Sequence, residues 1–368
     1  MVTLRTIPLQ CERRHGAPLI LRRFLARLIV LSAVLIAGIV VGRRSQIGTE
    51  SPGPVTPPEL SAVGLEEARA RTAEVEPLTA DRIVFCSDRT GNHEIYVMGA
   101  DGSNVKRLTL DLSFESWWPR ISPDRRRILF YRVPAGAKPE EIKVASLWVM
   151  NADGSDQRLL RPVGMDGWVV QGHAEWSPSG DQLVMVGGSF PNTQIFLTDD
   201  EGRHPRQITH RDGVNTDPSW SPDGKTIAFV SCAVSPCVEQ NFEIFTMPAA
   251  GGDVTQLTHN TMRDHDPYFS PDGASIAWLA ETEPNAFKPG IGVWSIFMMR
   301  SDGSDQHPVI KDRAINSVPR WTSGGATLIF HRYDVSLARW GVYRINLDGT
   351  GLHEITDARL GNSEYPSL

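Results

Sequence analysis

The chain has 368 residues and a formal net charge of −6 at pH 7. Its first 44 residues hold eight arginines and one glutamate, which leaves the remaining residues with a net charge of −13. Because nucleic-acid binding requires basic patches, this acidic remainder argues against a nucleic-acid partner.

The N-terminal region predicts a membrane anchor. Residues 1–23 form a basic tail, and residues 24–42 include an uncharged apolar run from Leu28 to Gly42. A spanning helix needs about 20 apolar residues, and the side chain of Arg27 can reach the membrane interface. Since basic flanks stay in the cytoplasm, we expect the tail there and the rest of the chain outside. A cleaved signal peptide is the alternative, but no convincing cleavage site adjoins the apolar run.

Residues 43–80 predict a linker. Four prolines between positions 52 and 58 are followed by a stretch rich in Glu, Ala and Arg. This composition is typical of a semi-rigid tether, with a short helix expected at residues 61–75. We expect the tether to hold the following domain away from the bilayer.

A repeated pair of turn signals organises residues 81–368. The first signal is Ser-Pro-Asp-Gly or a variant of it, with copies that begin at Ser122, Ser177, Ser221, Ser270 and Thr322. The second signal centres on a glycine that usually follows an aspartate, at Gly102, Gly154, Gly202, Gly251, Gly303 and Gly349. These glycines lie about 49 residues apart, a period typical of propellers and other repeat architectures.

Each repeat predicts four short antiparallel strands. In the copy at residues 217–258, four runs rich in β-branched and aromatic residues are separated by turn chemistry. Four such strands without an intervening helix make one propeller blade, whereas a β-sandwich, the alternative, does not need a repeated unit. The residue before each Ser-Pro signal is large and apolar and is expected to pack between blades: Ile121, Trp176, Trp220, Phe269 and Trp321.

The two ends of the repeat region complement each other. The first repeat lacks its opening strand, and the C-terminal residues 363–368 align with the opening strand at residues 215–220. We therefore expect an all-β, six-bladed propeller over residues 81–368, closed by the C-terminal strand. Closure in this way leaves no unpaired sheet edge at the junction.

Two cysteines lie close together in a predicted loop. Cys232 and Cys237 bracket Ala-Val-Ser-Pro between two expected strands. Outside the cytoplasm such a pair can form a disulfide that holds the loop. A metal site would need two further ligands nearby, and the sequence shows none.

The assembled repeat resembles the WD-like propeller repeat of TolB-family proteins. The residues that carry the resemblance are Asp-Pro-Ser-Trp-Ser-Pro-Asp-Gly at 217–224, Phe-Glu-Ile-Phe-Thr-Met at 242–247 and Glu-Ile-Tyr-Val-Met-Gly-Ala-Asp-Gly at 94–102. The resemblance covers residues 81–368 and implies a propeller of the bacterial envelope that binds proteins rather than catalysing a reaction. Similar repeats also occur in prolyl-oligopeptidase-type peptidases and oligogalacturonate-lyase-like enzymes.

The chain also departs from the TolB pattern. TolB resembles a soluble periplasmic protein with an additional N-terminal α/β domain, whereas a predicted membrane segment and linker occupy that place here. The partners of TolB therefore cannot be transferred to this chain.

The two faces of the predicted propeller differ. Strand alternation puts both kinds of tight turn on one face, the turn face, and the longer connections on the opposite loop face. Examples of the longer connections are 133–145, 231–241, 281–293 and 332–340. Because function concentrates on variable loops held by a rigid scaffold, we predict the binding site on the loop face.

Alignment of the innermost strands places one set of residues at the channel mouth on that face: Trp117, Trp118, His173, Asp217, His265, Asp266, Val318, Glu364 and Tyr365. Among these, Trp117, Trp118 and Tyr365 are expected partner contacts, since aromatic residues anchor interfaces. The histidines and carboxylates either hold a divalent cation or are ordinary polar residues of turns and rim.

Two functional hypotheses follow. The favoured one is a monomeric, membrane-anchored propeller without a cofactor that binds envelope proteins or peptides, or acts as a scaffold. The alternative is a metal-dependent polysaccharide lyase or glycan-processing enzyme with its site at the channel mouth. The sequence has no Gly-x-Ser-x-Gly nucleophile elbow, so the hydrolase half of a prolyl-oligopeptidase is absent.

Overall fold

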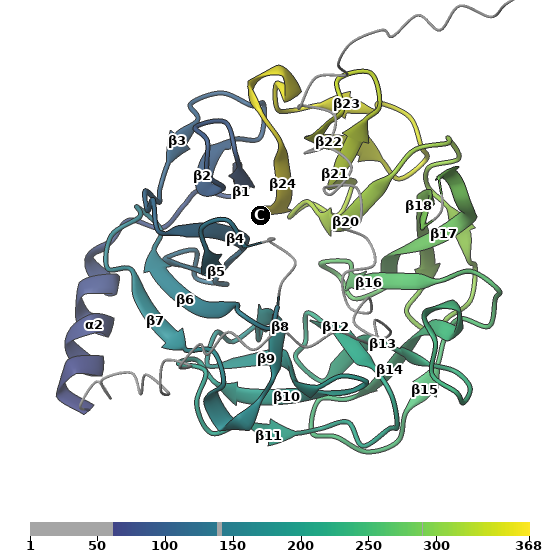
Figure 1. Cartoon of the computed structure of the whole chain (residues 1–368), viewed down its shortest axis with the longest axis horizontal. Helices are drawn as coiled ribbons and strands as arrows, with labels where there is room; N and C mark the ends of the chain where they lie inside the picture. Colours follow the sequence, from purple (N-terminus) through teal and green to yellow (C-terminus); the bar gives the residue numbers. More distant parts are fainter. Residues whose placement is uncertain (1–61, 138–141, 289) are drawn as a thin grey trace, which may run out of the picture.

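A computed structural model describes residues 62–137, 142–288 and 290–368. Within them, six four-stranded antiparallel sheets surround a central channel, so the expected six-bladed propeller is confirmed (Figure 1). The chain end lies at the centre of this view, beside the innermost strands.

From the channel outward, the strands of the six blades are ordered as follows. Blade 1 contains β24 (Ser363–Ser367), β1 (Arg82–Ser87), β2 (Glu94–Gly99) and β3 (Lys106–Arg107). Blade 2 contains β4 (Phe114–Ile121), β5 (Arg127–Pro134), β6 (Ser146–Asn151) and β7 (Arg158–Arg161). Blade 3 contains β8 (Val170–Trp176), β9 (Gln182–Ser189), β10 (Asn192–Asp199) and β11 (Arg206–Gln207).

The second half of the ring repeats this order. Blade 4 contains β12 (Asn215–Trp220), β13 (Thr226–Cys232), β14 (Phe242–Pro248) and β15 (Thr255–Gln256). Blade 5 contains β16 (Asp264–Phe269), β17 (Ser275–Lys288), β18 (Ile291–Arg300) and β19 (His307–Pro308). Blade 6 contains β20 (Asn316–Trp321), β21 (Thr327–Asp334), β22 (Arg339–Asn346) and β23 (His353–Glu354). Short 3₁₀ turns on the loop face are η2 (Met165–Gly167), η3 (Glu239–Asn241) and η4 (Ala358–Leu360).

The Ser-Pro-Asp-Gly motif forms a tight turn between the first two strands of a blade. In blade 4, the Ser221 hydroxyl donates to Oδ1 of Asp223 (2.6 Å) and accepts from the Thr226 amide (2.9 Å). Gly224 closes the turn at φ 69°, a left-handed conformation that glycine adopts without a Cβ penalty. The motif therefore fixes where each innermost strand ends.

Aromatic residues before these turns pack between blades, as expected. Trp176 is 6% exposed, and its indole N–H donates to the carbonyl of Arg120 in the preceding blade (3.2 Å). The indole of Trp321 donates in the same way to the carbonyl of Tyr268 (2.9 Å). Each indole thus buries an apolar surface and satisfies a backbone acceptor of the neighbouring blade.

The ring closes through pairing of the two ends of the propeller. Strand β24 pairs antiparallel with β1, with Val84 opposite Ser367 and Ser87 opposite Ser363. Blade 1 therefore contains residues from both ends of the repeat region, and the predicted closure by the C-terminal strand is confirmed.

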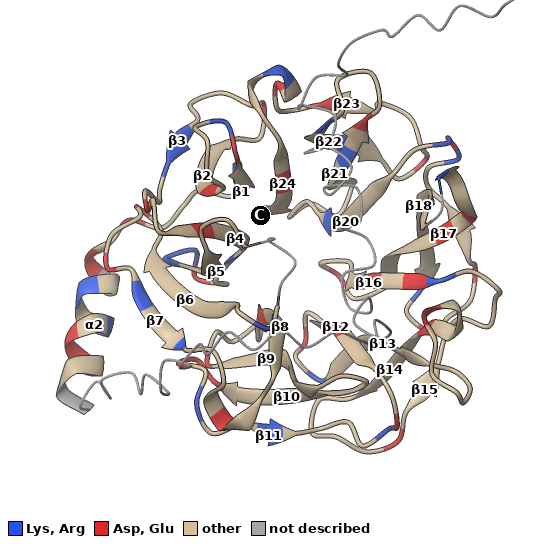
Figure 2. Cartoon of the chain, viewed as in Figure 1, with Lys and Arg blue, Asp and Glu red and all other residues tan. Residues whose placement is uncertain are grey.

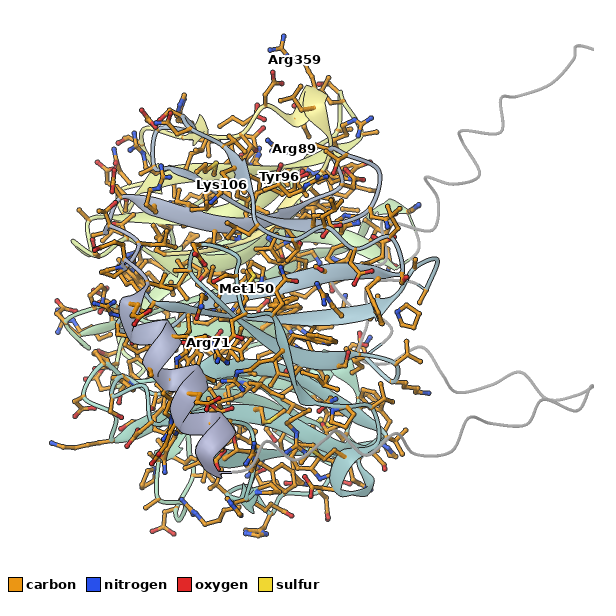
Figure 3. All side chains as sticks on the ribbon, turned by 90° about the vertical axis from the view of Figure 1, so that its left-hand side faces the viewer. Arg71, Arg89, Tyr96, Lys106, Met150 and Arg359 are labelled. Carbon is orange, nitrogen blue, oxygen red and sulfur yellow. A yellow bond between two sulfur atoms is a disulfide. The ribbon has the colours of Figure 1, made fainter. Side chains whose placement is uncertain are left out.

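In the part of the chain that the structure describes, helix α2 (Ala62–Glu74) precedes the propeller and lies along its outer side (Figure 3). Thr72 donates to the side chain of Asn151 in blade 2 (2.8 Å), and Arg69 pairs with Asp200 in blade 3 (2.9 Å). This part of the expected tether is therefore attached to the propeller.

The predicted basic tail (1–23), membrane segment (24–42) and first part of the linker lie outside the described residues. Within residues 62–137, 142–288 and 290–368, no helix combines the length and apolar character needed to cross a membrane. The membrane anchor therefore stays a prediction.

Deletion of residues 360–368 would remove β24 and open the ring. Strand β1 would then lose its inner partner, so we expect the melting temperature of the purified protein to fall by more than about 10 °C. Arg359→Ala, which changes an exposed side chain just before the deleted segment, is the control and should leave melting unchanged. Unchanged melting of the truncated protein would contradict closure through β24.

Candidate binding site in the central channel

Every innermost strand carries a β-bulge at the same level of the channel. In β12, for example, the register shifts between Thr216 and Ser219, and in β16 it shifts between His265 and Tyr268. One residue in each bulge has a left-handed backbone with φ between 50° and 55°, and we call this set the bulge ring: Trp118, His173, Asp217, Asp266, Val318 and Tyr365.

The bulge ring is a strained arrangement. Left-handed backbone is uncommon for any residue except glycine and is a genuine outlier for the β-branched Val318. Proline follows five of the six ring residues, which suits a bulge because proline has no N–H for the strand ladder. Backbone strain of this kind is common at functional sites, and here it occurs in all six innermost strands at the same level of the channel.

Asp217 is the polar centre of the bulge ring. Its Oδ1 lies 3.0 Å from Nδ1 of His173, and its Oδ2 lies 2.8 Å from Nδ1 of His265. The hydroxyl of Thr216 also donates to Oδ1 (2.9 Å). Burial opposes ionisation, but the adjacent His173 and His265 outweigh it and hold the pKa of Asp217 well below its usual range.

Asp266 lies beside Asp217, but its pKa is shifted in the opposite direction. Its backbone N–H donates to Oδ2 of Asp217 (3.3 Å), while its own Oδ1 is buried without a hydrogen-bond partner. Burial, reinforced by the charge of Asp217, raises the pKa of Asp266 to about 6. The surroundings thus lower the pKa of Asp217 and raise the pKa of the adjacent Asp266.

Three bulge-ring residues could hold a metal ion. His173, Asp217 and Asp266 each offer a ligand atom, and these atoms all lie within 4.8 Å of one another. Both oxygens of Asp217 already accept hydrogen bonds from histidines, so a cation would compete with those bonds.

The aromatic residues of the predicted site pack against each other. Trp118 stacks on Tyr365 and meets His173 edge-on, with ring centroids 4.5 Å apart in both pairs. Trp117 stacks on His93 at 3.7 Å. Since Trp117 and Tyr365 are each only 5% exposed, they serve channel packing, and the expectation that they contact a partner directly has no support from their burial.

Two histidines behind the bulge ring were not anticipated from the sequence. Burial lowers the pKa of His93, but its hydrogen bond to Glu115 (2.9 Å) and the Glu364 carboxylate 3.9 Å from its other ring nitrogen overcome this and raise the pKa to about 9. His331 accepts from the Tyr365 amide (3.3 Å), and burial lowers its pKa to about 3. Neither residue lies in an innermost strand, so alignment of those strands could not reveal them.

A second layer of polar residues lies two positions further along each innermost strand, toward the turn face: Arg120, Glu175, Ser219, Tyr268, Arg320 and Ser367. They line a cavity of about 260 Å³, together with turn prolines such as Pro222. Figure 2 shows charged residues of both signs on the innermost strands around the channel. The sequence analysis did not predict this layer, although alignment of the innermost strands puts a polar residue at this position in every blade.

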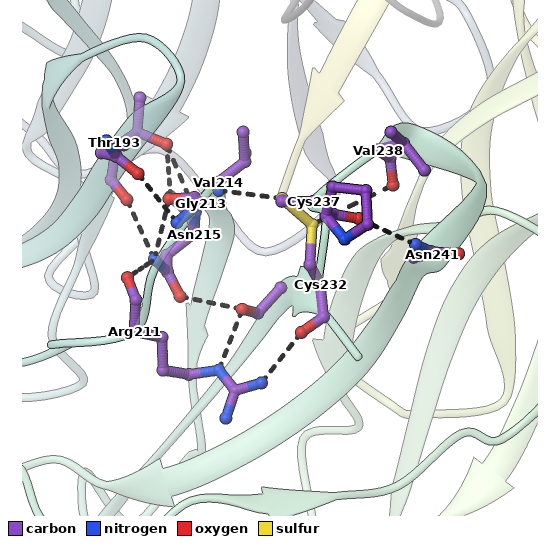
Figure 4. Close-up of a disulfide and its surroundings, with 12 residues drawn as sticks. Thr193, Arg211, Gly213, Val214, Asn215, Cys232, Cys237, Val238 and Asn241 are labelled. Carbon is purple, nitrogen blue, oxygen red and sulfur yellow. Dashed lines mark hydrogen bonds between the residues drawn. A yellow bond between two sulfur atoms is a disulfide. The ribbon is translucent and has the colours of Figure 1, made fainter. Parts of the chain in front are cut away.

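On the loop face, Cys232 and Cys237 form a disulfide with 5.4 Å between their Cα atoms (Figure 4). The amide of Val214 donates to the Cys237 sulfur (3.2 Å), which ties the connection between blades 3 and 4 to this loop. Gly213 has φ 86°, and a Cβ there would lie 2.5 Å from the Cys237 sulfur, so only glycine fits.

Comparison with known proteins places the fold in a family context. No family model matches the chain. A protein TolB homolog from Chlorobium luteolum is 34% identical over 152 residues, which is 40% of this chain and 31% of the relative. The crystal structure of TolB from Acinetobacter baumannii superposes with a TM-score of 0.61 and 16% identity, covering 83% of this chain and 71% of that one.

A putative TolB from Agrobacterium tumefaciens superposes with a TM-score of 0.55 and 21% identity, over 75% of this chain and 88% of that chain. The propeller of this chain is similar in fold to that of TolB proteins. It spans about a third of the length of the curated TolB relatives it matches, so their partners are not transferred to it.

One position of the TolB-like repeat carries an unusual residue in blade 5. Asp264 takes the place of Asn215 in blade 4 and Asn316 in blade 6. Oδ1 of Asp264 and Oε2 of its neighbour Glu243 are buried without a donor. Burial, with the nearby Glu243 carboxylate, raises the pKa of Asp264 to about 8, and a proton held between the two residues would satisfy both oxygens.

Asp264→Asn should stabilise the propeller in a pH-dependent way. The folded pKa of Asp264 lies above its unfolded value near 3.8, so the wild type loses stability as pH rises from about 4 to about 8. The variant does not carry this penalty, and its advantage should grow over that window by more than about 1 kcal/mol, since one pKa unit corresponds to about 1.4 kcal/mol. Denaturant unfolding at several pH values measures this, with the exposed Asp212→Asn as control. An advantage independent of pH would contradict the shared proton.

Proposed function

We propose that this chain is a membrane-tethered, extracytoplasmic propeller that binds a protein or peptide of the bacterial cell envelope at its loop face. Three observations support the proposal. The propeller is TolB-like, the disulfide Cys232–Cys237 suits an oxidising compartment, and residues 24–42 are apolar enough to predict an anchor.

The distribution of exposed apolar side chains carries the proposal. In residues 62–137, 142–288 and 290–368, twelve large apolar side chains are exposed, and only Val105 and Leu352 belong to turn-face connections. The other ten lie on the loop face, Phe287 near the end of β17 and the rest in connections: Leu110, Leu112, Val163, Val169, Val234, Val238, Phe287, Val335, Leu337 and Leu360. Apolar groups gathered on one face of a soluble domain are typical of an interaction surface.

A long hairpin adds to this surface. Strands β17 and β18 span 14 and 10 residues, whereas β13 and β14 of the neighbouring blade span 7 each. The hairpin therefore extends beyond the blade on the loop face and carries Phe287, which is 42% exposed. The 281–293 connection thus extends beyond the blade and exposes an apolar side chain, as a partner contact requires.

Site-specific photo-crosslinking in cells tests the proposal. A photoreactive amino acid replaces Phe287 or Leu112 on the loop face, and Val105 or Leu352 on the turn face as matched controls. We expect the same discrete protein adduct from both loop-face positions, recovered in the membrane fraction, and no adduct from the controls. Equal labelling from both faces, or adducts confined to cytoplasmic proteins, would contradict it.

A second candidate function is metal-dependent glycan processing at the bulge ring. The observation that favours it is the convergence of ligand atoms from His173, Asp217 and Asp266 within 4.8 Å. Carboxylate oxygens suit Ca²⁺ or Mn²⁺, and imidazole suits Mn²⁺ or Zn²⁺.

Calorimetric titration with Ca²⁺, Mn²⁺ and Zn²⁺ tests this second candidate. The wild type should bind one equivalent of metal, and the His173→Ala/Asp266→Ala double variant should lose the binding. His204→Ala, at an exposed histidine, is the control and should bind as the wild type does. A wild-type titration without saturable heat would rule the candidate out.

A further inference from the structure

The cavity on the turn face has its own chemistry, distinct from that of the bulge ring. It occupies about 260 Å³, and every blade contributes to its lining. Its walls include the aromatic side chains of Trp220, Tyr268 and Trp321, and its polar groups come from the second layer of the innermost strands. A cavity of this size accommodates a small chemical group rather than a folded surface.

Two arginines in this cavity share one carboxylate. Nε of Arg120 donates to Oε1 of Glu175 at 2.5 Å, and Nη2 of Arg320 donates to the same oxygen. Arg120 also donates to the Tyr268 hydroxyl (3.4 Å), while the Arg320 guanidinium lies 3.9 Å from the centre of the Tyr268 ring. Arg120 is 1% exposed, so this positive charge is buried in the wall and cannot move into solvent.

The charges of these three residues do not cancel. Two guanidinium groups face one carboxylate, so these three residues together carry one net positive charge, and the Asp266 carboxyl group at the bulge ring also attracts Arg120. Leu368 also lines the cavity, but in the part of the chain that the structure describes no ion pair joins it to either arginine. An anion in the cavity would interact favourably with the net positive charge of these three residues.

The cavity also contains donors that lack acceptors. Nε of Arg320 and the hydroxyl of Ser219 are both buried without a hydrogen-bond partner. Buried donors of this kind normally find an acceptor, and a ligand that brings acceptor oxygens would supply one. A planar carboxylate matches the fixed fork of a guanidinium.

We propose that this cavity binds a carboxylate group through Arg320, with Ser219 as a second donor and Arg120 as the buried charge behind it. The single charge of a carboxylate matches the net positive charge of Arg120, Glu175 and Arg320, whereas the charge of a phosphate dianion exceeds it. The carboxylate comes either from a free organic acid or from the C-terminal end of a peptide. The site lies on the face opposite the proposed protein-binding surface and does not depend on it.

Calorimetric titration of the purified full-length protein at low ionic strength tests the proposal. The probes are sodium propionate, N-acetyl-Gly-Ala with a free carboxylate, its C-terminal amide and sodium phosphate. We expect saturable binding of a carboxylate probe and none of the amide. Comparable binding of propionate and the peptide acid identifies a free-acid site, and a strong preference for the peptide acid identifies a peptide-end site.

Variants with opposite expected effects separate a binding role from a structural one. Arg320→Gln removes a donor and a charge and should weaken carboxylate binding at least about tenfold. Glu175→Gln removes the competing charge while keeping an acceptor for the arginines, and should strengthen binding several-fold. Arg344→Gln, at an exposed arginine of the same blade as Arg320, should leave binding unchanged.

Four outcomes would overturn the proposal. These are the absence of saturable binding by either carboxylate probe, binding of the amide as strong as that of the acid, tighter binding of phosphate than of carboxylate, and wild-type affinity in Arg320→Gln. Circular dichroism of each variant confirms that the propeller is folded, and Arg320→Lys, which keeps the charge, should retain part of the affinity if Arg320→Gln does not fold. The photo-crosslinking result for the loop face is independent of all these outcomes.

Discussion

The pairing of β24 with β1 is the constraint on which the rest of the structure depends. A propeller is a ring of twisted sheets, and each innermost strand holds its position only if both neighbouring blades are in place. The pairing of Val84 with Ser367 and of Ser87 with Ser363 joins the two ends of the repeat region in one blade. Without it, blade 1 would present an unpaired strand edge to solvent, and the channel would have a gap in its wall.

Closure aligns six bulged strands around one axis, and this alignment creates two chemically different levels in the channel. At the bulge ring, Asp217 links histidines from blades 3 and 5. At the next level toward the turn face, Arg120 and Arg320 from blades 2 and 6 meet on Glu175 from blade 3. Neither cluster exists within a single blade, so both depend on the packing of blades around the channel, and the pair of arginines from blades 2 and 6 depends on closure of the ring as well.

Repetition made much of this predictable from the sequence. Because every repeat has the same phase, the turn motif indicates where each innermost strand ends, and the residues of the bulge ring followed from alignment alone. Residues 363–368 matched the missing first strand for the same reason. The disulfide pair was visible as two cysteines in one loop, since its geometry depends on local chain separation.

Other features depend on packing between blades and lay beyond the sequence. The burial of Trp117 results from stacking on His93, which lies outside the innermost strands of the aligned set. Loop lengths do not indicate the turn-face cavity, because the side chains of Arg120 and Arg320 meet only through Glu175 of a third blade. The attachment of α2 through Thr72 to Asn151 likewise joins residues 79 positions apart.

Hydrogen–deuterium exchange of the full-length protein tests the closed ring most directly. The amides of β1 that face β24 are compared with the amides of β13 that face β12 within blade 4. If both chain ends build blade 1, the two sets should be protected to a similar extent, because both lie between an inner strand and an outer one. Fast exchange confined to β1 and β24 would show an open ring and would contradict the account of the channel.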